Sequence, residues 1–572
     1  MKINIIYGIV IVFFISSCGK DFLERKPLDA IGNGSFWKTP KDLEMYVDQF
    51  YPNFPNDLNF DTKLLDGNSD NQILVSFDPT LAGTRVLSAT DAGWSTNWAN
   101  IRSVNYFFKN YQTVSGSFDL MKQFVGEAYF FRAYFYFALV RRYGDIPWIN
   151  KVLEGSSDEL YSARSPRNIV VDSVIADLDK AISYMKNKGQ GSPSRLNSQV
   201  ALLFKSRVSL FEGTWEKYHA GTPFGVANSD GSKYLKIARD AAKEVIDGGL
   251  YEVYSTGNPN IDYARLFGQN DYSTNSEVML WKKWDKNLGL VHRIPSIWGM
   301  GMGVTKELVD SYLSIDGLPI AVSPLYAGDA TLLNVVKNRD PRLGQSIWVP
   351  GDFLNVLVSG DTTVFKKADI NQTGSYLNVT GYQLKKYSNM WGDNLKLNYY
   401  ESEVSSIIFR YAEVLLNYAE AKAELGEITQ IDLDLTINKL RDRVGLPHLN
   451  LSSITFDPNW DYPQLSPIIN EIRRERRVEL AFEGLRLDDL LRWRAHSIFV
   501  NKRSLGAKFV QADYPTMVVG TNVYVNANGY IDAYQKALPA GYGFKPDRDY
   551  LSAIPTNELT LNKKYTQNPG WY

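Results

Sequence analysis

The four histidines are the first side chains to consider for catalysis or metal binding. They are scattered along the chain and form no HExxH motif or other paired spacing of metal ligands: His219, His292, His448 and His496. The sequence also lacks the G-x-S-x-G motif of serine hydrolases. A glycosidase needs two carboxylates whose separation is set by the fold, so the 63 acidic residues leave every such pair open. We therefore predict no catalytic residue, no metal site and no cofactor.

Cys18 is the only cysteine of the chain, and its surroundings predict lipidation. Lys2 and an apolar run over residues 5–15 precede it. The run is too short to span a bilayer, and it has the length and flanks of a cleaved export signal. Residues 15–18 (Ile-Ser-Ser-Cys) look like a bacterial lipobox, in which Cys18 becomes the acylated N-terminus. Several acyl chains are enough for stable membrane anchoring. The alternative is a plain secretory signal with an incidental cysteine.

Composition narrows the kind of ligand. The formal net charge of the 572 residues is -1, which argues against an electrostatic nucleic-acid-binding surface. Aromatic residues make up 13% of the chain, and most of them are expected in the core. Aromatic rings also stack on the C–H faces of sugars, while amides and carboxylates bind sugar hydroxyls. An exported, neutral, aromatic-rich chain therefore fits a sugar-binding protein.

Two settings make particular tryptophans candidates for ligand binding. Trp298 stands in the glycine-rich segment 297–303, whose small neighbours bury a large ring poorly, so it is the first candidate. Trp281 and Trp284 flank two lysines in an expected strand, where alternation would send them to opposite faces. At most one of this second pair is then expected in the core.

Residues 471–494 are dense in arginine and invite comparison with a basic nucleic-acid-binding stripe. Opposite charges stand three or four positions apart within this segment, at Arg476 and Glu479, Glu483 and Arg486, and Asp488 and Arg492. On a helix such spacings place opposite charges side by side. The segment is therefore predicted to form ion pairs within a scaffold.

The elements that must position these residues are mostly helices. Apolar residues recur at helical spacing in seven stretches: 126–142, 167–186, 198–218, 234–247, 406–425, 436–444 and 467–494. Alanines face aromatic residues in these stretches, and glycine or proline ends them. Helices of this kind are typical of tetratricopeptide-like hairpins, here in an irregular set without a constant period.

The composition changes in the middle of the chain, where glycine, proline, asparagine and aspartate rise. Short alternating runs such as residues 277–281 indicate strands there. We expect a signal peptide at 1–17, a lipidated tether at 18–35 and a single domain at 36–572. Within that domain, a helical scaffold would span about 36–256 and 401–572, and a loop- and strand-rich elaboration about 257–400.

Several segments, taken together, resemble the SusD/RagB (SusD-like) family of outer-membrane nutrient-binding lipoproteins. They occur in the expected order along the mature chain, after the lipobox: residues 131–136 with 143–147, 339–343, 409–421, 437–441, 475–488, 554–559 and 568–571. The resemblance implies a mainly α-helical fold with four tetratricopeptide-like pairs and a ligand-binding half rich in loops and short strands. It also implies a surface-exposed outer-membrane protein without catalysis, which captures oligosaccharides and passes them to a SusC-like TonB-dependent transporter.

The resemblance adds site residues as well. In the family, the loop before the helix that contains Trp94 and Trp98 lies near the ligand groove. These two rings share a helix face, where packing is the ordinary interpretation, and Trp94 at the helix start is expected to be the more exposed. The family also places the loop 66–71 beside the glycan, so Asn68 and Asp70 would bind sugar hydroxyls.

Two other functions stay open at this point. Part of the family resembles peptide-capturing, RagB-like lids. An exported lipoprotein glycosidase is a further alternative, because carboxylate geometry is not readable from sequence.

Overall fold

The computed structural model describes residues 36–55, 61–292, 300–356, 362–388 and 401–572. Cys18 and Trp298, both singled out above, lie outside these ranges.

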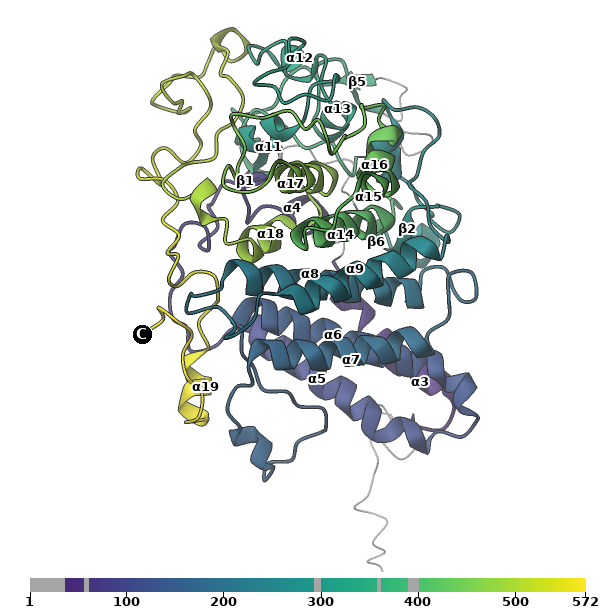
Figure 1. Cartoon of the computed structure of the whole chain (residues 1–572). Helices are drawn as coiled ribbons and strands as arrows, with labels where there is room; N and C mark the ends of the chain where they lie inside the picture. Colours follow the sequence, from purple (N-terminus) through teal and green to yellow (C-terminus); the bar gives the residue numbers. More distant parts are fainter. Residues whose placement is uncertain (1–35, 56–60, 293–299, 357–361, 389–400) are drawn as a thin grey trace, which may run out of the picture.

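Antiparallel helices form one half of the molecule, in the lower part of Figure 1. Five long helices follow one another: α5 (Ala92–Asn110), α6 (Phe118–Tyr143), α7 (Arg167–Tyr184), α8 (Ser198–Tyr218) and α9 (Ser232–Asp247). Each packs against the next, and α3 (Pro40–Asp48) packs against α6. Side-chain caps fix two of their starts: Asp91 accepts hydrogen bonds from the backbone of Gly93 and Trp94, and Asn197 accepts one from Val200.

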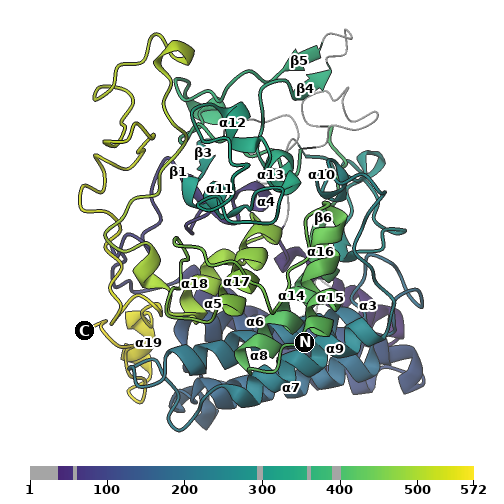
Figure 2. The ribbon, with the colours of Figure 1, turned by 45° about the horizontal axis from the view of Figure 1, so that its top comes forward.

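The helical stack continues with elements from far along the chain. Helix α14 (Tyr411–Glu424) packs against α9, and α17 (Pro467–Glu479) packs against α14. The helices α15 (Gln430–Leu435), α16 (Ile437–Arg443) and α18 (Arg486–Arg492) complete this layer. Figures 1 and 2 both show it between the long helices and the strand-containing half. The predicted mainly α-helical, tetratricopeptide-like fold is confirmed.

The strand-containing half is built of short elements. Strand β1 (Gln72–Leu74) pairs antiparallel with β3 (Met302–Val304), and β4 (Phe353–Val356) pairs with β5 (Thr362–Val364). Short helices surround them: α4 (Asp61–Leu64), α10 (Asp262–Leu266), α11 (Lys306–Ser311), α12 (Leu332–Val336) and α13 (Pro341–Ser346). The C-terminal segment with α19 (Thr556–Leu561) runs along one side of both halves, in yellow in Figure 1.

Two of the expected helices were wrong in part. Residues Ser406–Arg410 form strand β6, which pairs with β2 (Val278–Lys282), and the helix begins only at Tyr411. The stretch 467–494 is two helices, because the chain turns between α17 and α18 with Phe482 at φ +66° and Gly484 at φ +76°. A left-handed backbone at two nearby positions cannot continue an α-helix.

The arginine-rich segment does form ion pairs, as predicted, but with other partners. Glu479 is fully buried and binds Arg342 at 2.9 Å, Arg410 at 2.7 Å and Arg443 at 2.6 Å, three arginines from different elements. Glu483 pairs with Lys386 and Arg410, and Asp488 pairs with Arg141. Arg476 pairs with Asp489, and Arg492 pairs with Glu420 and also with Asp489, three positions away on the same helix. The buried charges therefore join the helical layer to the strand-containing half.

Candidate functional site

A cleft of about 670 Å³ opens beside Asn68, and we call it the Asn68 cleft. One wall is the loop 78–91 that leads into α5, and a second is the turn between α17 and α18 with the first residues of α18. Arg141 and Arg142 at the C-terminal end of α6 and residues from the C-terminal segment close it. The cleft therefore unites four stretches that are far apart in the sequence.

Asn68 is held at the cleft by its neighbours in the loop 66–71. The Asp66 carboxylate accepts hydrogen bonds from the backbone N–H of Phe482 at 2.7 Å and of Gly484 at 3.1 Å. Asp70 binds Arg486 through two hydrogen bonds, at 2.7 and 2.8 Å. Both carboxylates are buried, so the loop is clamped against the α17–α18 turn, and Asn68, which is only partly buried, stays at the surface of the cleft.

The two clamping carboxylates differ in their ionisation. Burial by itself would raise the pKa of Asp70, but the charges of Arg477 and Arg486 lower that pKa to about 2. Burial raises the pKa of Asp66, and its hydrogen bonds with Asn71, Phe482 and Gly484 oppose this rise. Asp70 is therefore a structural anion at neutral pH, already occupied by arginine. This arrangement leaves little of its carboxylate for the sugar hydroxyls that the sequence predicted, and its role in binding stays a prediction.

Positive and negative side chains alternate around the Asn68 cleft. Arg142 pairs with Asp91 at 2.7 Å, and Arg141 pairs with Asp488 at 2.5 Å. Planar guanidinium and carboxylate groups offer paired donors and acceptors to a polar ligand. Because each arginine is matched by an acid, the cleft suits an uncharged polar ligand with many hydroxyl groups.

Trp571 and Arg85 also line the Asn68 cleft. The sequence had not identified either of them as a site residue. Two guanidinium groups lie over the ring of Trp571, that of Arg85 at 5.4 Å and that of Arg548 at 4.4 Å from the ring centre. Arg85 also donates hydrogen bonds to the backbone carbonyls of Asp549 and Leu551. Trp571 belongs to a C-terminal motif that carried the family resemblance, which was the one available signal. Nothing in the sequence near Arg85 indicates its position.

The tryptophans of α5 pack in the core. Trp94 is 4% exposed, and its ring lies 5.0 Å from that of Tyr143 and 5.8 Å from that of Trp98. Trp98 is half-buried, so the expectation that Trp94 is the more exposed was wrong. The reason is that the end of α6 covers the first turn of α5. Neither ring lines the Asn68 cleft, and ligand binding by either stays a prediction.

Trp281 and Trp284 are both buried, at 5% and 4% exposure, so the expectation of at most one core ring was wrong. Strand β2 ends at Lys282, and alternation therefore no longer governs Trp284. The indole N–H of Trp284 donates to the Ser406 hydroxyl at 3.1 Å. Trp281 lines a different pocket, about 380 Å³ in volume, that is separate from the Asn68 cleft.

The sequence predicted that the glycine-rich segment 297–303 lies close to Asn68 and Asp70. The described part of that segment argues against this arrangement. In the antiparallel register of β1 and β3, Val75 donates its N–H to Gly301, at one end of β1. Asp70 lies at the other end, where its carbonyl accepts the Thr305 hydroxyl. Gly301 of the glycine-rich segment therefore lies at the opposite end of β1 from Asp70. Trp298 itself falls outside the described residues.

The described residues contain no group of three or more His, Cys, Asp or Glu side chains placed to hold a metal ion. Within the same ranges, no helix is both long and apolar enough to cross a membrane.

Comparison with known proteins places the chain in a family. A family model described as "SusD family" matches residues 261–571, and one described as "Starch-binding associating with outer membrane" matches residues 53–210. The chain is 24% identical to SusD-like protein P2 of Formosa agariphila over 593 residues, covering 98% of both chains. Among solved structures, a SusD-like carbohydrate binding protein from Bacteroides fragilis is 22% identical with a TM-score of 0.71, covering 92% of this chain and 99% of its own. A laminarin binding SusD-like protein is 20% identical with a TM-score of 0.54, covering 93% and 100%. Since the first family model spans more than half of the sequence, the protein belongs to the SusD family.

Proposed function

We propose that the protein is a surface lipoprotein of the outer membrane that captures oligosaccharides without cleaving them and delivers them to a SusC-like TonB-dependent transporter. Family membership supports this role, as do structural neighbours that bind laminarin or were solved with xylogluco-oligosaccharide. The observation that carries the ligand class is the Asn68 cleft. Its matched arginines and acids offer many hydrogen bonds without net charge, as an uncharged glycan requires.

Calorimetry with a panel of neutral oligosaccharides, including xyloglucan and laminarin fragments, tests the ligand class. Asn68→Ala is expected to weaken binding about fivefold, the effect of losing roughly one hydrogen bond. Arg142→Ala should cost at least as much, because a charge-assisted hydrogen bond is stronger. Asn528→Ala, in a surface loop outside the residues that line the Asn68 cleft, serves as the control. Equal binding by all four proteins would contradict the assignment of the cleft. Shortening of any oligosaccharide at catalytic rates would instead favour a glycosidase.

The anchor and the transporter need separate tests. Cys18→Ala should release the protein from the membrane fraction, because the acyl chains are its proposed attachment. Persistent surface exposure of this variant on intact cells would refute lipidation at Cys18. Mild detergent extraction and pull-down of the wild-type protein should recover a TonB-dependent barrel, and recovery of the lipoprotein alone would argue against the partnership.

A further inference from the structure

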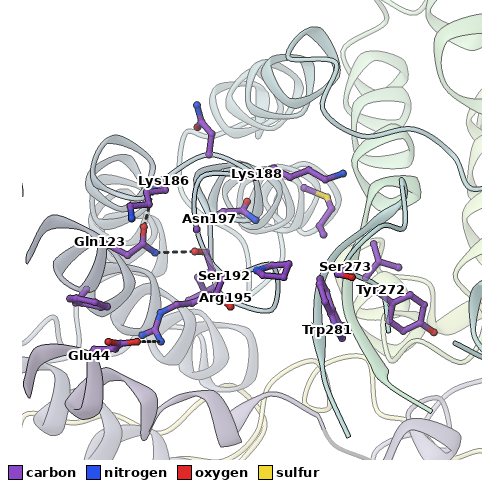
Figure 3. A pocket seen from close by; sticks show the side chains of 18 of the residues that line it. Glu44, Gln123, Lys186, Lys188, Ser192, Arg195, Asn197, Tyr272, Ser273 and Trp281 are labelled. Atoms are coloured by element: carbon purple, nitrogen blue, oxygen red, sulfur yellow. Dashed lines mark hydrogen bonds and ion pairs between the residues drawn. The ribbon is translucent and has the colours of Figure 1, made fainter. Parts of the chain in front are cut away.

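A second pocket lies at the other end of α6, between its first turns, the loop 186–197 and strand β2. We call this pocket of about 380 Å³ the α6 slot. Figure 3 shows Trp281 and Tyr272 together on one side of it, with Gln123, Arg195 and Glu44 on the opposite side. The slot therefore has one aromatic wall and one polar wall.

Two packed rings form the aromatic wall. The rings of Trp281 and Tyr272 meet edge to face at 6.2 Å, and both side chains are almost wholly buried. The indole N–H of Trp281 is buried without a hydrogen-bond acceptor among the residues that the structure describes. A buried donor without a partner is costly, and a small shift of the wall that brings it to a ligand oxygen would remove that cost.

The polar wall is held in place by bonds within the protein. Arg195 donates to the Glu127 carboxylate at 2.7 and 2.8 Å. Gln123 donates to the same carboxylate at 2.7 Å and to the carbonyl of Leu196, and it accepts the N–H of Lys186 at 2.8 Å. These side chains shape the slot in advance, which lowers the entropy that a ligand must lose on binding.

Two lysines at the mouth of the slot lack acidic partners. Neither Lys186 nor Lys188 has a carboxylate within ion-pairing distance in the described part of the chain. The Lys188 ammonium lies 3.8 Å from the centre of the Tyr251 ring and donates to the carbonyl of Leu250 at 2.9 Å. Burial lowers the pKa of Lys188, and the charge of Glu252 only partly opposes this. A ligand anion at the mouth would therefore supply the missing counter-charge.

We propose that the α6 slot is a second saccharide site that binds an acidic sugar, with the sugar ring at the Trp281 wall and its anionic group at Lys186 and Lys188. This proposal extends the glycan-binding function proposed above to a separate site with a different ligand preference. Gln123 and Arg141 mark the two sites on α6 and are 18 positions apart in the sequence. At the rise of an α-helix, the sites are separated by about 27 Å. A long glycan that places an acidic sugar in the slot and neutral sugars in the cleft would bind more tightly than a short one through effective concentration.

Calorimetry on the full mature protein tests the slot with three tetrasaccharides: galacturonic acid, a sulfated carrageenan fragment and a neutral xyloglucan fragment. The double variant Lys186→Gln/Lys188→Gln should weaken binding of the acidic probes about tenfold, the scale of one charge-assisted hydrogen bond. Its binding of the neutral probe should stay unchanged. Trp281→Phe should weaken the same acidic binding, and added salt should weaken it further. The tighter of the two acidic probes identifies whether the anion is a carboxylate or a sulfate.

Matched controls separate this site from the Asn68 cleft. Lys536→Gln removes an exposed lysine that lines neither pocket and should leave all binding intact. Asn68→Ala should leave binding of the acidic tetrasaccharide intact as well. The proposal is overturned if wild-type protein binds no acidic probe, if the double lysine variant binds it normally, or if Asn68→Ala abolishes it. Loss of neutral-glycan binding in the Asn68 variant bears only on the cleft, so the two assignments fail independently.

Discussion

Neutralising Asp70 is the sharpest test of how the Asn68 cleft is built. Asp70→Asn keeps the shape of the side chain but removes the charge that faces Arg486 at 2.7 and 2.8 Å and Arg477 at 3.0 Å. The fall of the Asp70 pKa from 3.8 to about 2 corresponds to about 2 kcal/mol of stability at neutral pH. Leaving two buried arginines without their anion adds to this, and breaking buried pairs typically costs about 3–5 kcal/mol. We therefore expect the variant to lose about 2–5 kcal/mol.

Urea unfolding followed by circular dichroism measures this loss as a shift of the midpoint at constant slope. Asp119→Asn is the matched control, because Asp119 pairs with Lys122 on the surface of α6 and is 81% exposed. Such a pair contributes at most about 1 kcal/mol. The sign of the pH dependence follows from the lowered pKa: the Asp70 contribution is complete above pH 3.8 and is lost as the pH falls through about 2. If Asp70→Asn shifts the midpoint no more than Asp119→Asn does, the loop is not held by this ion pair.

Three more predictions concern Glu479, Gly484 and His219. Glu479→Gln removes the anion shared by three buried arginines and should cost about 3–5 kcal/mol in the same unfolding assay; a loss below 1 kcal/mol would mean that the arginines find other partners. Gly484→Ala combines a left-handed backbone at φ +76° with a new Cβ 3.2 Å from Leu65, and it should cost more than Gly257→Ala, where φ is +82° and no atom lies within 4 Å. Equal losses of stability in the two variants would mean that the left-handed backbone accounts for the whole effect. Burial lowers the pKa of His219 to about 3, so the unfolded chain takes up a proton below pH 6.5 while the folded chain does not. Between pH 7 and pH 5 this should cost about 2 kcal/mol that His219→Gln no longer shows; an unchanged pH dependence in that variant would exclude His219 as the source.

The local sequence pattern correctly predicted most of the helices. It also predicted that the charged residues of the arginine-rich segment form ion pairs. Ser198–Tyr218 was predicted at its observed bounds, because helical periodicity and the Asn197 cap act within a few residues of each other. The same reasoning predicted ion pairs for the arginine-rich segment. Family motifs spread along the chain then led to the SusD family, since each of those motifs can be recognised without knowledge of its neighbours in space.

The partners of those groups depended on tertiary structure. Ser406–Arg410 carries a pattern compatible with a helix start, and it becomes a strand because β2, more than a hundred residues earlier, pairs with it. Spacing within one helix could not show that Glu479 would meet arginines from three other elements.

The same distinction governs the two candidate sites. The sequence by itself determined that the chain is rich in aromatic rings and nearly neutral, which suits a glycan-binding protein. Tertiary structure decided that Trp94 is covered by the end of α6, that Asp70 is occupied by Arg486, and that Arg142 and Asn68 line the same cleft. Periodicity reports on neighbours along the chain, whereas burial and pairing are set by residues that only the folded chain brings into contact.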